Sequence, residues 1–172
     1  MSSLKRHHLP NRLNGRIRHI CFLLFTYLTL TTLSAEPAVD PKAALAEADR
    51  LAWLKNWTRA EPFFAKAEQG FTAAGDRRDS LYAKVGRLRG EMRSGSPQIS
   101  SHEVALLLND PLVKTDRALR LRCLTVKGDA DLDIDSNLAQ RDWKEALVLA
   151  RELGLPDWES RAKGELGIIA FL

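Results

Sequence analysis

A spacing of large residues and alanines that occurs twice in the chain constrains its fold most strongly. Its members are Trp57, Ala60, Phe64 and Ala67 in the first copy, and Trp143, Ala146, Ala150 and Leu153 in the second. Steps of three and four residues place these side chains on one face of a helix. Large residues next to alanines let two helices pack closely, and repetition of the unit predicts a stack of helix hairpins. Such a scaffold is typical of proteins that bind other molecules.

The first 35 residues are predicted to be an export signal. Five Lys and Arg precede an apolar run at residues 20–33, which ends shortly before Ser34 and Ala35. A membrane-spanning helix needs about 20 residues, so a cleaved signal peptide is favoured over a permanent anchor. In the alternative, the run stays attached and holds the domain at the outer face of the inner membrane. We therefore expect a periplasmic or secreted domain at residues 36–172, or one anchored outside the cytoplasm.

Charge argues against a nucleic-acid partner once this leader is set aside. The leader holds five of the 26 Lys and Arg and none of the 22 Asp and Glu, which leaves 21 against 22 and a net charge of −1. The formal charge of +4 for the whole chain therefore comes from the leader. We expect membrane contact only if the leader is not cleaved.

Cysteine and histidine are too few for several kinds of site. Beyond the leader only His102 and Cys123 remain. A zinc site needs three or four such ligands, so no Cys/His metal site is expected within one chain, and no disulfide either. Cys123 stands among apolar residues, which predicts a buried core side chain. We expect no cofactor and no bound metal.

About seven helices are predicted from apolar periodicity and from turn residues. The expected segments are 41–52, 57–74, 79–92, 100–108, 115–127, 136–153 and a last one that begins near 158. Ser100-x-x-Glu103 has the pattern of a capping box and predicts the start of the fourth helix. The apolar residues of the fifth helix cover more than one of its faces, as expected for a helix packed between neighbours.

Four aspartates at alternate positions precede the sixth helix. They are Asp129, Asp131, Asp133 and Asp135. A calcium loop that begins at Asp129 would need glycine at its sixth position and glutamate at its twelfth, but the chain has Ile134 and Gln140 there. A solvated loop that leads into a helix is favoured over a metal site, because acidic side chains suit a helix N-terminus.

These residues together resemble the tetratricopeptide-repeat family, in which pairs of antiparallel helices repeat about every 34 residues. Ala60, Phe64 and Ala67 match the small, aromatic and alanine positions of the family's second helix. Leu166 and Gly167 match the leucine-glycine pair of a first helix. The resemblance implies an all-α antiparallel helix-hairpin solenoid over residues 41–172, whose last repeat is incomplete. It also implies self-association or continuation of the chain at the C-terminal helix.

Positively charged residues on the first helices are the candidate ligand groove. In this family first helices line the binding side, and between Arg77 and Lys127 the chain has eleven Lys or Arg against five Asp or Glu. The candidates for contact with an acidic peptide are Lys84, Arg87, Arg117, Arg120 and Lys127. For any one of these residues, a solvated helix face is favoured over a ligand contact. For Trp53 and Trp158, a packing role is favoured over a role as contact anchors.

The sequence contains no recognisable catalytic motif. There is no Ser/His/Asp constellation and no glycine-rich phosphate loop. We therefore expect an exported, non-catalytic scaffold that binds protein or peptide. The alternative is the N-terminal extracytoplasmic recognition module of a larger membrane signalling or peptidase-type protein.

Overall fold

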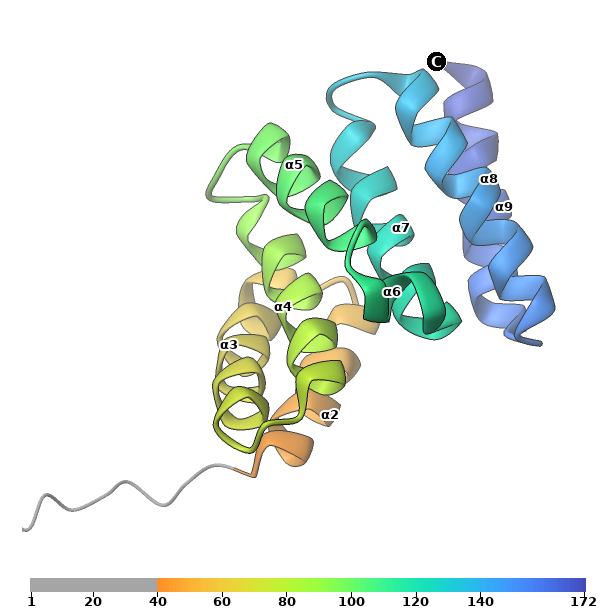
Figure 1. The fold of residues 1–172 in the computed structure, drawn as a ribbon. Coiled ribbons are helices and arrows are strands. Elements are labelled where there is room, and N and C mark those ends of the chain that lie inside the picture. Colours follow the sequence, from red (N-terminus) through yellow and green to blue (C-terminus); the bar gives the residue numbers. More distant parts are fainter. Residues whose placement is uncertain (1–39) are drawn as a thin grey trace, which may run out of the picture. The chain divides into compact units, whose positions relative to one another are not determined.

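The computed structural model describes residues 40–172, and the predicted export signal or anchor lies outside the described residues. The described part is all-α, with eight helices (Figure 1). They are α2 (Pro41–Trp53), α3 (Trp57–Ala73), α4 (Arg77–Glu91), α5 (Pro97–Leu108), α6 (Pro111–Thr115), α7 (Arg117–Asp131), α8 (Ser136–Glu152) and α9 (Pro156–Phe171). The prediction of an all-α fold is confirmed.

The helices form a stack of hairpins in which each long helix packs against its neighbours in sequence. α2 pairs with α3, α4 is followed by α5, α7 pairs with α8, and α9 packs against α8 (Figure 1). In addition, α4 contacts α2 and α7, so the first helices of successive pairs also touch one another. We call the surface made by α2, α4, α7 and α9 the first-helix face. The predicted helix-hairpin solenoid agrees with this arrangement.

Two features of the middle of the chain differ from the prediction. The one-turn helix α6 was not expected; Asp110 stabilises its start, because its carboxylate accepts a hydrogen bond from the backbone N–H of Leu112 at 2.8 Å. The capping-box prediction at Ser100 is wrong, because α5 already begins at Pro97. Ser100 lies inside the helix, is buried, and donates its hydroxyl to the carbonyl of Leu88.

The acidic segment before α8 is also different from a solvated loop. α7 continues to Asp131, so Asp129 and Asp131 are helical, and Asp131 is fully buried. Of the four aspartates, Asp135 behaves as a helix-start residue: its side chain accepts a hydrogen bond from the backbone N–H of Asn137 at 2.8 Å. In the described residues no group of three His, Cys, Asp or Glu side chains is placed to share a metal ion.

The core is divided among the helix interfaces instead of forming one central cluster, as expected for a stack. Most of the repeated motif is buried in it. The buried members are Trp57, Ala60, Phe64, Ala67, Trp143, Ala146 and Ala150. Leu153 and Leu166 are partly buried, whereas Gly167 is exposed and has open space around it. The large residues of the motif therefore lie in the hairpin interfaces, but Gly167 makes no close helix contact.

Two other glycines permit the close approach of paired helices. A Cβ atom at Gly86 of α4 would lie 2.6 Å from the ring of Phe64, and one at Gly128 of α7 would lie 2.6 Å from the indole nitrogen of Trp143. Each glycine thus receives the large aromatic side chain of the neighbouring second helix. Both aromatic residues were predicted from the sequence as packing residues, but neither glycine was.

Glycine-to-alanine substitutions are expected to have opposite signs at these sites and at an open site. Gly86→Ala and Gly128→Ala should each lower the free energy of unfolding by about 1–3 kcal/mol, because the new methyl group overlaps a fixed ring. Gly164→Ala in α9, where no atom lies within 4 Å of a new Cβ, should raise it by about 0.5–1 kcal/mol through helix propensity. Urea denaturation followed by circular dichroism measures all three. A gain at Gly128 would contradict the packing described above.

Candidate functional site

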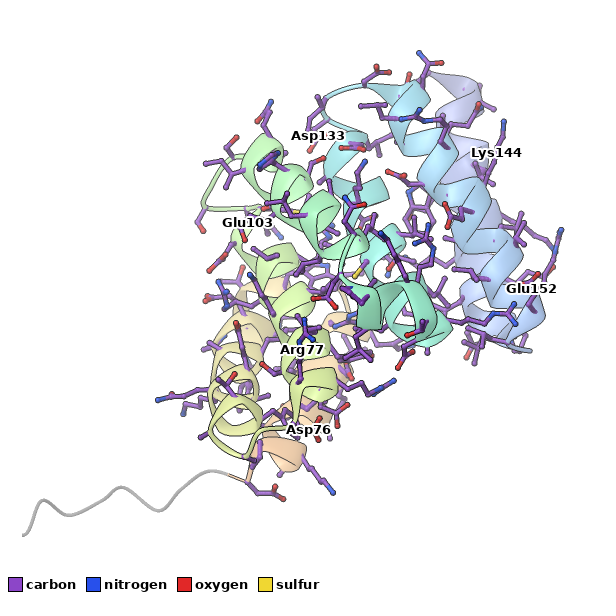
Figure 2. The ribbon with its side chains drawn as sticks, in the orientation of Figure 1. Asp76, Arg77, Glu103, Asp133, Lys144 and Glu152 are labelled. Atoms are coloured by element: carbon purple, nitrogen blue, oxygen red, sulfur yellow. The ribbon has the colours of Figure 1, made fainter. Side chains whose placement is uncertain are left out.

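The five predicted groove cations lie on α4 and α7, but they point toward the second helices and not across the first-helix face. Lys84 pairs with Glu103 of α5, and Arg87 pairs with Glu68 of α3 and Glu91 of its own helix. The three cations of α7 bridge to α8: Arg117 to Glu152, Arg120 to Glu145 and Lys127 to Asp142. Figure 2 shows Glu103 and Glu152 among the side chains on the α5 and α8 sides of the fold.

Ion pairs balance most of the positive charge that is counted along the sequence. Of the eleven Lys and Arg between Arg77 and Lys127, nine have a carboxylate partner within the described part of the chain. Several of these partners, such as Glu68 and Asp142, come from outside that segment. A long-range attraction for an acidic partner is correspondingly weaker than the sequence count suggests. The ligand groove made by the five residues stays a prediction, and each of their charges is already paired with a carboxylate.

A different arginine is at the centre of the first-helix face. Arg122 of α7 is only 6% exposed, and its guanidinium pairs with Asp49 of α2 at 3.2 Å. The same guanidinium lies over the ring of Tyr82 in α4, 4.5 Å from its centroid, and over Phe64 at 5.1 Å. Burial raises the pKa of Asp49, and Arg122 opposes that rise. One side chain thus connects α2, α4 and α7.

Two further arginines, both paired with Asp129 of α7, connect α4, α7 and α9. Asp129 accepts hydrogen bonds from Arg89 of α4 at 2.7 Å and from Arg161 of α9 at 3.0 Å. Arg89 also lies over the ring of Trp57 at 4.9 Å. Arg161 lies against Trp158 at 5.4 Å. The carboxylate of Asp129 therefore pairs with two guanidinium groups, and each of these also lies over a tryptophan ring.

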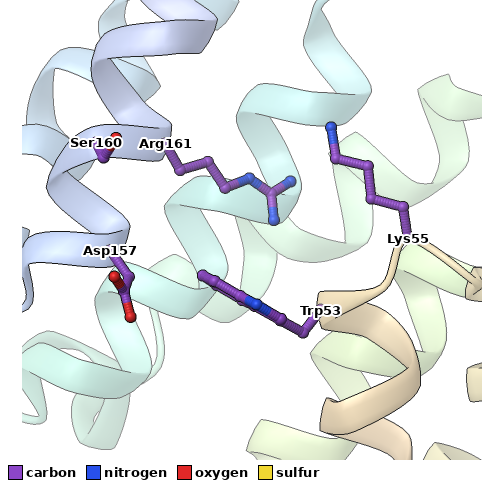
Figure 3. Close-up of a pocket in the computed structure, with 5 residues that line it drawn as sticks. All are labelled: Trp53, Lys55, Asp157, Ser160 and Arg161. Atoms are coloured by element: carbon purple, nitrogen blue, oxygen red, sulfur yellow. The ribbon is translucent and has the colours of Figure 1, made fainter.

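A hollow open to solvent lies on this face beside Trp53, between the C-terminal end of α2 and the first turns of α9. Trp53 is 57% exposed, and its ring meets the ring of Trp158 edge to face at a centroid distance of 6.3 Å. The hollow measures about 320 Å³ and is lined by Trp53, Lys55, Asp157, Ser160 and Arg161 (Figure 3). A smaller hollow of about 170 Å³ adjoins it and shares Trp53 and Arg161. The two tryptophans named as contact anchors or packing residues thus lie side by side.

A buried polar cluster lies away from this hollow, between α7, α8 and α5. Lys127 donates to Asp142 at 2.8 Å and also pairs with Asp131, which accepts a hydrogen bond from Ser101. Burial raises the pKa of Asp142 from its ordinary 3.8 to about 6, and the charge of Asp131 nearby adds to the rise. The cluster connects α5 with α7 and α8. None of the four residues named here lines the hollow beside Trp53.

Asp142 is expected to make stability fall as the pH rises from about 4 to about 6. The folded protein binds the proton of this carboxyl more tightly than the unfolded chain, so its stabilising contribution is present below the unfolded pKa and is lost as the pH passes the folded pKa. Urea midpoints at a series of pH values should show this fall in the wild type and a smaller fall in Asp142→Asn. Identical pH profiles would contradict the assignment.

Cys123 and His102 take no part in the hollow. Cys123 is fully buried, as the sequence predicts, and burial raises the pKa of its thiol to about 12. His102 is exposed on α5. A thiol with so high a pKa is a poor nucleophile at neutral pH.

Trp53 and Trp158 were named from the sequence, as contact anchors or as packing residues, whereas Arg122 and Arg161 were not named as site residues. Nothing in the local sequence distinguishes Arg122 from Arg117 and Arg120, which lie on the same helix and are more exposed. The partners of Arg122, Asp49 and Tyr82, are 73 and 40 positions away, and no local spacing indicates them. Their identification required the fold.

Comparison of the chain with protein-family models, with curated proteins and with solved structures gives no match. Among the described helices, none is both long and apolar enough to cross a membrane.

Proposed function

We propose that this helical domain is a non-catalytic recognition module that binds a segment of another protein on its first-helix face. The observation that carries the proposal is the hollow beside Trp53, where a largely exposed indole stands among charged and hydroxyl side chains. Trp and Arg are enriched among the residues that dominate binding energy in protein interfaces. An exported scaffold of tetratricopeptide-like repeats is the class that the sequence pattern favours for such a module.

The packing of the stack supports this proposal. Ion pairs and stacked guanidinium groups tie α2, α4, α7 and α9 to one another beneath the hollow. A face that is held in place before a ligand arrives loses less conformational entropy on binding. The first-helix face therefore has both an exposed contact residue and a supported base.

Selection from a displayed library of random dodecapeptides tests the proposal directly. The bait is the full chain as recovered from cells, with its helicity checked by circular dichroism. We expect enrichment of sequences that share a motif and compete with one another for one site. Enrichment of no motif by the folded protein would contradict a peptide-binding function.

The alternative function, as the extracytoplasmic recognition part of a larger membrane signalling or peptidase-type protein, is favoured by the uncovered side of α9. Ile168 is 52% exposed and Phe171 is 94% exposed, so this helix has uncovered apolar surface within the described residues. The intact mass of the native protein, captured from its cells with an antibody to residues 36–75, separates the two cases. A mass that corresponds to residues 36–172 supports the stand-alone scaffold with a cleaved leader, and a much larger mass supports the alternative.

A further inference from the structure

We infer that the paired hollows beside Trp53 bind one aromatic side chain of an extended peptide, together with a carboxylate on the residue that follows it. The inference rests on the proposed function and specifies its ligand. Trp53 and Arg161 line both hollows and thus form the wall between them. A ligand that occupies both must pass over the exposed ring of Trp53.

The smaller hollow has the size and walls for a single aromatic ring. Its volume of about 170 Å³ is close to the roughly 150 Å³ cavity that takes up benzene in a well-known engineered protein. Its aromatic lining residues are Trp53, Trp57, Tyr82 and Trp158. The guanidinium of Arg122 is at its base, held by Asp49 and Tyr82 and almost completely buried. An aromatic ring inserted there gains edge contacts with the tryptophans, while Arg122 stays stacked on Tyr82 and Phe64.

The larger hollow supplies the charge for the neighbouring residue. Lys55 has no ion pair within the described part of the chain, whereas Arg161, on the same side of Trp53 in Figure 3, is already paired with Asp129 and Glu165. Lys55 is therefore positioned to attract a ligand carboxylate.

The opposite side of the larger hollow is suited to the main chain of the same peptide. Asp157 lies across the indole from Lys55 (Figure 3) and likewise has no ion pair in the residues that the structure describes. Its carboxylate accepts hydrogen bonds, and the hydroxyl of Ser160 both donates and accepts. Main-chain N–H groups of an extended segment are donors of the kind that these acceptors bind.

Isothermal titration calorimetry of the full chain with three matched peptides tests the inference. The peptides are acetyl-Gly-Ser-Phe-Asp-Ser-Gly-amide, the same peptide with Leu in place of Phe, and the same peptide with Asn in place of Asp. We expect the Phe-Asp peptide to bind about tenfold more tightly than either of the others, since each exchange removes one of the two recognised groups. Equal affinity for the Phe and Leu peptides would overturn the aromatic site.

Three variants assign the effect to the hollow. Trp53→Ala should weaken binding of the Phe-Asp peptide by about tenfold or more, whereas Leu54→Ala, at the adjacent and equally exposed position that lines neither hollow, should change it less than about twofold. Lys55→Gln should remove the preference for Asp over Asn and keep the preference for Phe over Leu. Equal effects of Trp53→Ala and Leu54→Ala would show that the peptide binds elsewhere.

The binding results also distinguish failure of this inference from failure of the proposed function. If library selection yields a binding motif but the Phe-Asp peptide does not bind, the module recognises peptides of another class and the aromatic-carboxylate ligand is wrong. If neither experiment yields binding by the folded chain, both proposals are wrong. Binding of the Phe-Asp peptide that depends on Trp53 supports both.

Discussion

Trp143→Ala is expected to lower the free energy of unfolding by about 3–5 kcal/mol. Trp143 is fully buried where α7, α8 and α9 meet, among Leu121, Leu124 and Ile169. Gly128 approaches its indole on one side, and Arg161 stacks over it at 5.6 Å. Removal of the ring leaves a cavity that a rigid hairpin interface closes only in part. Urea denaturation followed by circular dichroism measures the loss.

The matched control makes the same substitution at Trp53. Because Trp53 is 57% exposed, Trp53→Ala should change the free energy of unfolding by no more than about 0.5 kcal/mol. The two variants thus separate a tryptophan that stabilises the fold from one that is free to contact a ligand. Similar losses at both positions would mean that Trp53 is a packing residue, contrary to its proposed role.

Asp129→Ala is expected to destabilise the fold by about 3 kcal/mol, because it leaves two guanidinium groups without their carboxylate in a largely buried setting. Asp129 has only 9% of its side chain exposed and pairs with both Arg89 and Arg161. Asp129 therefore connects α4, α7 and α9. Its removal should lower the midpoint of the unfolding transition and also make unfolding less cooperative along the stack. Thermal and urea unfolding of the variant measure both quantities.

Two other aspartates of the same acidic segment serve as controls, for which smaller losses of unfolding free energy are expected. Asp133→Ala, at an exposed position, should lie within about 0.5 kcal/mol of the wild type. Asp135→Ala removes the side-chain acceptor at the start of α8 and should cost about 1 kcal/mol. A solvated acidic loop would instead show small effects at all three positions, so the order of the three losses tests the structure against that interpretation.

The helices could be predicted from the sequence because their signals are local. Asp40 caps the start of α2 through its side chain, next to Pro41 in the first turn. The break before Trp57 and the glycines at 75 and 154 mark helix ends through backbone conformation, and both glycines adopt positive φ angles, of 73° and 66°. α6 was missed because a single turn is too short to show periodicity. The start of α5 was misplaced because Ser100 occurs in a capping pattern but faces inward.

The candidate site was only partly predictable for a different physical reason. Lys84, Arg87, Arg117, Arg120 and Lys127 were singled out by charge along the chain, and charge along the chain does not show which carboxylates are close in space. Glu68, Glu145 and Asp142 become partners only when the second helices pack beside the first. Trp53 and Trp158 could be named as candidates but not joined, because 105 positions separate them in the sequence.

The all-α class and the repeated hairpin follow from the amino-acid sequence, because helix periodicity and helix ends depend on neighbours within a few residues. The same local pattern assigns Trp143 and Phe64 to helix interfaces. By contrast, the roles of Arg122 and Asp129 as internal connectors, and the exposed position of Trp53 beside Trp158, emerge only from the folded arrangement. The reason is that electrostatic partners and exposure depend on distances between helices far apart in the chain, and those distances exist only after the helices have stacked.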